Sequence, residues 1–173
     1  EDEERSASSL PPIRSREYRV SRGLLRDVLA GLWDISALDV PLNALPGQPP
    51  SLADGWGFTS FSHCRDALLI AWSSVNLGVD LERKDRSFAA DQIAKRFFSQ
   101  EEKSSLKYLK KDKRRKLVLE QWLIKEAAIK WQKGTLAADF KKWVYLHNSQ
   151  KALHQCLGHQ VGIHMLQYGP WSM

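Results

Sequence analysis

The stretch LGVDLE, residues 77–82, is the most informative part of the sequence, because its apolar and non-apolar residues alternate strictly. This alternation predicts a strand with one apolar face and an opposite face that carries Gly78, Asp80 and Glu82. The two carboxylates would lie about 6.8 Å apart, where they repel each other and are costly to bury without a counter-charge. A Mg²⁺ ion between them would relieve both problems, and Gly78 leaves room for a ligand or another backbone. The pattern alone favours the ordinary alternative, an edge strand with a solvated acidic face.

A second informative stretch, WLIKEAAIK, covers residues 122–130. In a helix, Trp122, Glu126 and Lys130 share one face at the spacing i, i+4, i+8. They lie beside an apolar stripe of Leu119, Leu123 and Ala127, so Glu126 and Lys130 are expected near the edge of the core-facing side. The alternative is an ordinary surface Glu–Lys pair, which would contribute about 0.2–0.5 kcal/mol.

The rest of the chain predicts helices and short strands. A change of period and a capping box at Ser99 and Glu102 mark where helices begin, and Gly134 is placed to end the longest one. Helices are predicted for residues 16–31, 88–98, 99–109 and 112–133. Strands are predicted for residues 56–61, 67–72, 77–82 and 161–168. Short strands packed under helices indicate an α+β fold.

The composition limits the class of protein. The chain has 173 residues, of which 43% are hydrophobic, so it is long enough for one domain or two small halves and too apolar for disorder. No apolar run approaches the roughly 20 residues of a membrane span. The acidic N-terminus lacks an apolar signal core, and Cys64 and Cys156 fit no disulfide framework. A cytoplasmic protein that does not bind membranes is therefore expected.

Positive charge is concentrated in one part of the chain. The net charge is +6, yet the run KSSLKYLKKDKRRK, residues 103–116, contains eight basic residues and one acidic residue. Such a run forms either a solvated helix face or a docking surface for an anionic partner, and nucleic acid and an acidic protein both qualify. Tyr108 is its one aromatic residue, which weakens the nucleic-acid interpretation. Leu106, Tyr108 and Leu109 would either contact the partner or belong to the core, and the core is the favoured interpretation.

The two motifs together resemble the 4′-phosphopantetheinyl transferase superfamily. The sequence Gly-Val-Asp-Leu-Glu followed by Trp-x-x-Lys-Glu-Ala-x-x-Lys is similar to its Sfp-type branch, in which two similar halves form one chain. Phe61-Ser62-His63-Cys64 resembles the Ser-His segment of the family, and IAKRFFS, residues 93–99, resembles its Ala-x-Arg-Phe-Phe helix end. A weaker similarity covers SRGLLR, residues 21–26. The good match covers about residues 57–134.

The resemblance implies a reaction and a set of site residues. Such enzymes transfer the 4′-phosphopantetheine arm of coenzyme A to a serine of a carrier protein and release adenosine 3′,5′-bisphosphate. By this resemblance, Mg²⁺ is held by Asp80, Glu82 and Glu126. Glu126 is also the expected base, and Lys130 is expected to stabilise the pyrophosphate. Coenzyme A would be bound by Ser62, His63, Arg22 and Lys130. One departure is Gly47-Gln48-Pro49, which places Gln48 where the family commonly has a lysine.

The resemblance also implies an architecture. Two similar α+β halves would pack as one pseudo-dimeric unit, with the first half shortened. Residues 1–15 would be a loose N-terminal arm, residues 16–55 the remainder of the first half with a Pro-rich linker, and residues 56–173 the second half with the metal and catalytic motifs.

The implied activity is that of a holo-[acyl-carrier-protein] synthase. Its partners would be coenzyme A and an acidic acyl or peptidyl carrier protein, with no nucleic acid, and the chain would work as a monomer. The pathway stays open among fatty acid, polyketide, nonribosomal peptide and glycolipid synthesis. Two alternatives remain: a non-catalytic basic module that binds nucleic acid, and an inactive member of the transferase family.

Overall fold

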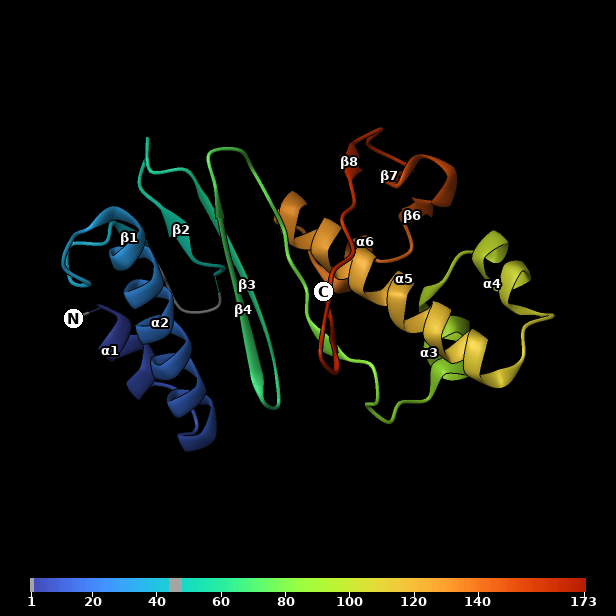
Figure 1. Cartoon of the computed structure of the whole chain (residues 1–173), viewed down its shortest axis with the longest axis horizontal. Coiled ribbons are helices and arrows are strands. Elements are labelled where there is room, and N and C mark those ends of the chain that lie inside the picture. Colours follow the sequence, from blue (N-terminus) through green and yellow to red (C-terminus); the bar gives the residue numbers. More distant parts are fainter. Residues whose placement is uncertain (1, 44–47) are drawn as a thin grey trace. The chain divides into compact units, whose positions relative to one another are not determined.

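The computed structural model describes residues 2–43 and 48–173. The chain divides into two compact units, the first formed by Glu1–Phe61 and Ile70–Leu77 and the second by Ser62–Leu69 and Gly78–Met173. Figure 1 shows the helices and strands of both units. The α+β class that the sequence predicts is confirmed. The pseudo-dimeric arrangement of two similar halves stays a prediction.

The first unit is built around one long helix. It contains α1 (Asp2–Ser8), α2 (Pro12–Trp33), β1 (Leu42–Asn43) and β2 (Ser51–Leu52), and β1 and β2 pair antiparallel. The buried face of α2 packs Leu25 and Leu29 against Val40 and Leu42. β1 and β2 lie in the predicted Pro-rich linker, of which residues 44–47, including Gly47, fall outside the described part of the chain.

The prediction of a loose arm at residues 1–15 is wrong for the described residues 2–15, because α1 and the first turn of α2 lie there. Pro12 occupies the first position of α2, where a proline is favoured because its missing N–H would have no helical partner. The short helix α1 is attached by its own side chains. Ala7 is fully buried, and Glu3 forms an ion pair with Arg26 at 2.8 Å.

A two-stranded sheet of β3 (Phe58–Cys64) and β4 (Ala67–Ser73) follows, and the division between the units falls within both strands. It confirms the two strands predicted for residues 56–61 and 67–72, with somewhat different ends. The predicted helix of residues 16–31 is likewise confirmed by α2.

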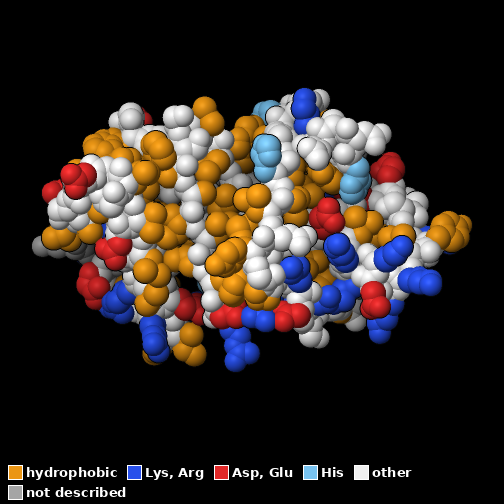
Figure 2. Space-filling model, in the orientation of Figure 1, with side chains coloured by type: hydrophobic (Ala, Val, Ile, Leu, Met, Phe, Trp, Pro, Cys, Tyr) orange, Lys and Arg blue, Asp and Glu red, His pale blue; other side chains and the backbone are white. Residues whose placement is uncertain are grey.

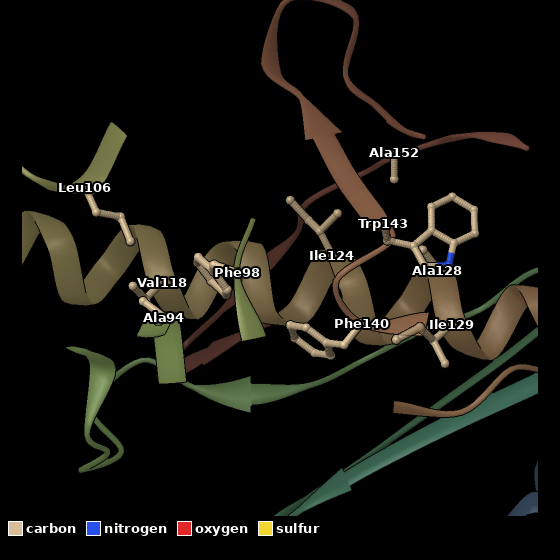
Figure 3. Close-up of a cluster of buried hydrophobic side chains, with 10 residues drawn as sticks. All are labelled: Ala94, Phe98, Leu106, Val118, Ile124, Ala128, Ile129, Phe140, Trp143 and Ala152. Carbon is tan, nitrogen blue, oxygen red and sulfur yellow. The ribbon is translucent and has the colours of Figure 1, made fainter. Parts of the chain in front are cut away.

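The second unit is organised by α5 (Lys111–Gln132). Two helices precede it, α3 (Ala90–Phe97) and α4 (Gln100–Leu106), and α6 (Leu136–Asp139) follows it. Both α3 and α6 contact α5. An antiparallel sheet of β6 (Trp143–Leu146), β7 (Lys151–His154) and β8 (Gln160–Gly162) also packs on α5, with the short 3-10 helix η1 (His147–Ser149) between β6 and β7. Figure 3 shows the buried side chains between these elements, among them Phe98, Ile124, Phe140 and Trp143.

Helix starts follow the local sequence. At α4, the Ser99 hydroxyl accepts from the backbone N–H of Glu102 at 3.2 Å, and the Ser99 N–H donates to the Glu102 carboxylate at 2.8 Å. The predicted capping box is therefore confirmed. The structure also confirms α3 and α5 close to the predicted ranges, and α5 ends at Gln132, with Lys133 as its C-cap residue directly before Gly134.

Two predicted strands are wrong in part. Of residues 77–82, only Glu82 belongs to a strand, β5 (Glu82–Arg83), which pairs antiparallel with β10 (Trp171–Ser172). The preceding residues are in no strand, because Gly78 lies against the backbone of α5 instead of a neighbouring strand. The predicted strand at residues 161–168 is interrupted. Its first part belongs to β8, which pairs with β7, and its last part is β9 (Gln167–Tyr168), which pairs with β10.

The described helices give no evidence of a membrane span. Among the described residues, none of the helices combines the length and the apolar character that crossing a membrane requires.

Candidate functional site

The site begins where the segment before β5 meets α5. A Cβ atom added to Gly78 would lie 2.1 Å from the Ala127 carbonyl oxygen and 2.4 Å from the Trp131 nitrogen. Only a glycine permits such a close approach between this segment and a helix backbone. Of the two uses that the sequence suggested for the space at Gly78, the structure shows the approach of another backbone. The contact fixes Asp80 beside the turn of α5 that carries Glu126 and Lys130.

Asp80 is a buried carboxylate with two partners. Its side chain is about 5% exposed, and its Oδ1 accepts from the Ser62 hydroxyl at 2.6 Å and from Lys130 Nζ at 2.7 Å. The hydrogen bond and the ion pair provide the compensation that a buried charge requires. Ser62 on β3, Asp80 before β5 and Lys130 on α5 therefore converge from three separate parts of the sequence.

Glu126 is the second carboxylate of this site. The pKa of Glu126 is raised to about 7, first by burial and second by the negative charge of Asp80. The charge of Lys130, a hydrogen bond from the Trp122 indole and the charge of Arg86 act against this rise. A carboxyl with a pKa near neutrality can take up or release a proton at physiological pH.

The fit of these residues to a divalent cation can be judged from their charges. Asp80 and Glu126 are oxygen donors of the kind that Mg²⁺ prefers, and their mutual repulsion raises the Glu126 pKa. A cation placed between them would relieve that repulsion. The donor chemistry of these two residues therefore fits Mg²⁺.

Glu82, the third predicted ligand, has a different partner. Its carboxylate forms an ion pair with Arg86, four residues later. Among residues 2–43 and 48–173, no group of three or more His, Cys, Asp or Glu side chains is arranged to hold a metal ion. The ligand set of Asp80, Glu82 and Glu126 stays a prediction, and Glu82 would have to exchange Arg86 for the ion.

The predicted contacts for coenzyme A lie on different faces. Ser62 is buried and donates to Asp80, whereas the next residue of β3, His63, is exposed. The two side chains point to opposite sides of the strand, as neighbouring strand residues do. Gln48, the residue that replaces the common lysine, is exposed.

Arg22 lies in the first unit, on α2. Its guanidinium is buried and lies 4.9 Å from the ring centroids of Tyr18 and of Phe61. Its Nε and Nη1 atoms make no hydrogen bond within the described part of the chain. Buried guanidinium N–H groups without an acceptor are unusual, and they are chemically suited to an anion.

Sequence reasoning missed a buried ion pair beside the site. Lys125 is fully buried, and its Nζ lies 2.8 Å from the Glu102 carboxylate and 3.2 Å from the Phe140 carbonyl oxygen. Burial lowers the pKa of Lys125, whereas the charge of Glu102 raises it. The signal was a lysine that directly follows the apolar pair Leu123-Ile124, together with the capping-box residue Glu102.

The basic run is divided between the core and the surface. Leu106 is buried and Leu109 is half-buried against the core, as predicted. The prediction that Tyr108 belongs to the core is wrong, because its side chain is 86% exposed. The turn between α4 and α5 carries Tyr108 outward while its apolar neighbours pack inward.

Comparisons with known proteins identify the family of the chain. The family model described as the 4′-phosphopantetheinyl transferase superfamily matches residues 76–167, more than half of the chain, and this range includes Asp80, Glu126 and Lys130. The chain is also 27% identical over 124 residues to the 4′-phosphopantetheinyl transferase HetI from Nostoc sp. strain PCC 7120. That alignment covers 69% of this chain and 52% of HetI, so the chain spans about half the length of this curated relative. The resemblance seen in the motifs is confirmed, and the chain belongs to the 4′-phosphopantetheinyl transferase superfamily.

Proposed function

We propose that this protein transfers the 4′-phosphopantetheine arm of coenzyme A to a serine of an apo acyl or peptidyl carrier protein and releases adenosine 3′,5′-bisphosphate. The observation that supports this most strongly is the convergence of Asp80, Glu126 and Lys130 within the part of the chain that the family model matches. Two carboxylates and one ammonium group suit phosphoryl transfer, in which positioning and charge stabilisation do most of the work.

The residues of the site can carry the reaction through simple steps. The serine oxygen of the carrier attacks the phosphorus that bears the pantetheine arm, and the bond from that phosphorus to the bridging pyrophosphate oxygen breaks. Glu126, whose pKa is about 7, accepts the proton of the serine hydroxyl. Lys130 stabilises the negative charge on the leaving phosphate, and the Ser62 hydroxyl keeps the Asp80 carboxylate in place.

Mg²⁺ is part of this proposal. Asp80 and Glu126, with Glu82, would hold the ion, which supplies charge neutralisation at the pyrophosphate when bound. The charge of Asp80 supports this assignment, because after burial it is the second cause of the raised pKa of Glu126.

Coenzyme A binding is proposed for Ser62, His63, Arg22 and Lys130. The exposed imidazole of His63 and the guanidinium N–H groups of Arg22 without hydrogen bonds are chemically suited to phosphate. Ser62 and Lys130, which both donate to Asp80 Oδ1, would contribute to coenzyme A binding from the site around Asp80. We further propose that the protein works as a monomer in the cytoplasm, and its two free thiols are consistent with a reducing compartment.

The test is a labelling assay with a panel of apo acyl and peptidyl carrier proteins, coenzyme A and Mg²⁺, read by mass spectrometry. The wild-type protein should add the mass of one arm to a carrier. Glu126→Gln should abolish labelling, whereas Glu120→Gln, on the same helix, should label at the wild-type rate. Labelling by Glu126→Gln at the wild-type rate would show that Glu126 has another role. If none of the carriers is labelled, the protein is an inactive member of the family.

A further inference from the structure

The turn after β5 places an arginine beside one of the proposed metal ligands. The Arg86 side chain forms an ion pair with Glu82, and the two side chains are 38% and 17% exposed, so the pair is partly shielded from solvent. Figure 2 shows Lys and Arg side chains gathered over the end of the second unit where α4 and the start of α5 lie, whereas Arg86 is paired with a carboxylate of the candidate site.

Several contacts fix the position of Arg86. Arg115 on α5 donates to the Lys84 carbonyl at 3.0 Å and also donates to the Arg86 carbonyl. The guanidinium of Arg86 lies 5.6 Å from the centroid of the Phe88 ring, and the guanidinium of Arg115 lies 5.1 Å from the same centroid. These contacts attach the turn to α5, and they hold Arg86 where it meets Glu82.

The charge of Arg86 also reaches a second carboxylate of the site. Burial and the charge of Asp80 raise the pKa of Glu126, and the charge of Arg86 is among the influences that act against this rise. Asp80 is itself paired with Lys130 at 2.7 Å. The three proposed metal ligands therefore have two cationic side chains of this chain as counter-charges, Lys130 and Arg86.

We propose that Arg86 is an internal competitor of Mg²⁺ at Glu82, so that the ion reaches this carboxylate only when the guanidinium leaves it. This inference rests on the proposed function, in which Glu82 is a ligand of the ion. A guanidinium and a divalent cation both bind carboxylate oxygens, and they repel each other when they are close together. Arg86 therefore supports the fold, because it neutralises a largely buried carboxylate, and at the same time weakens the binding of the ion.

The test is a calorimetric titration with Mg²⁺ in the absence of coenzyme A and carrier. Arg86→Gln should bind Mg²⁺ about fivefold more tightly than the wild type, because the ion no longer displaces an ion pair or meets a nearby positive charge. The difference should become smaller at high salt, where interactions between charges are screened. Arg86→Lys keeps the positive charge and should bind Mg²⁺ as weakly as the wild type.

Arg83 provides a matched control in the same turn. It follows Glu82 on β5, and neighbouring strand residues point to opposite faces. Its guanidinium pairs with Asp66 and Asp85 instead of Glu82. Arg83→Gln removes the same charge and should change the Mg²⁺ affinity by less than about twofold, because the remaining interaction is screened. If it tightens Mg²⁺ binding as much as Arg86→Gln does, the effect is one of overall charge and the proposal is wrong.

Thermal unfolding gives a second measurement that does not depend on activity. In buffer with EDTA, Arg86→Gln should unfold at a lower temperature than the wild type, because Glu82 has lost its counter-charge. At one fixed concentration of Mg²⁺, the melting temperature should rise more for Arg86→Gln than for the wild type, since tighter binding stabilises the folded state more. An equal rise for both proteins would contradict the competition.

The labelling assay separates this proposal from the proposed reaction. Tighter Mg²⁺ binding by Arg86→Gln, with no carrier labelled by the wild type, would support the competition and reject the reaction. Labelling by the wild type, together with equal Mg²⁺ affinities of the wild type and Arg86→Gln, would support the reaction and reject the competition. If neither protein binds Mg²⁺, the competition is likewise rejected.

Discussion

The Glu126 carboxylate should destabilise the folded protein at alkaline pH. Its pKa rises from 4.5 to about 7 because the side chain is largely buried and lies near the charge of Asp80. Between these two values the folded chain binds more protons than the unfolded chain, so the free energy of unfolding falls as the pH rises. Each unit of the pKa corresponds to about 1.36 kcal/mol, which gives a penalty of about 3 kcal/mol that is fully present above pH 7.

Glu126→Gln removes this penalty, because the amide has the same shape and no titration. Relative to the wild type, the variant should gain about 3 kcal/mol in the free energy of unfolding as the pH is raised from 4.5 to 8. The measurement is urea unfolding at a series of pH values in buffer with EDTA, which removes any divalent cation. Glu120→Gln on the same helix serves as the control for the loss of one carboxylate from α5.

The outcome decides whether the folded protein holds Glu126 in a buried site that raises its pKa. A stability difference between Glu126→Gln and the wild type that stays constant from pH 4.5 to pH 8 would refute the reasoning. Addition of Mg²⁺ at pH 8 extends the experiment. It should stabilise the wild type more than Glu126→Gln, since the variant has lost one of the proposed oxygen ligands.

Three other substitutions test the surroundings of the site by urea unfolding. Gly78→Ala should destabilise the fold by about 1–3 kcal/mol, because the new methyl group would lie 2.1 Å from the Ala127 carbonyl oxygen; a neutral effect would contradict the close contact. Lys125→Met should cost about 3–5 kcal/mol by leaving the buried Glu102 carboxylate without its cation, and the further change Glu102→Gln should restore part of the loss. Ser99→Ala should cost about 1 kcal/mol through loss of the capping box, and an unchanged midpoint would show that the cap contributes nothing.

Features that depend on local sequence could be predicted from it. The periodic helices and the capping box at Ser99 follow from the residues within one or two turns, so no distant contact is needed to explain them. The grouping of Asp80, Glu126 and Lys130 follows from the family resemblance that the two motifs carry together, since each motif alone favours an ordinary surface pattern.

Features that depend on distant contacts could not be predicted. The alternation of residues 77–82 looks like a strand, yet most of this segment packs on the backbone of α5 and has no neighbouring strand. A sequence pattern indicates which residues are buried, but it does not indicate which part of the chain packs against them. For the same reason, the pair Lys125–Glu102 was missed: its two partners lie 23 residues apart in the sequence and become neighbours only through the fold.

The contact of Gly78 with α5 also determines how the site can vary. Since backbone meets backbone there, repacking of nearby side chains cannot alter the spacing between the aspartate segment and the helix. A kink or a change of helical pitch near Ala127 would instead shift residues 78–80 together and displace Asp80. The motifs at residues 77–82 and 122–130 are far apart along the chain but in direct contact. A backbone change in one of them therefore requires a matching change in the other.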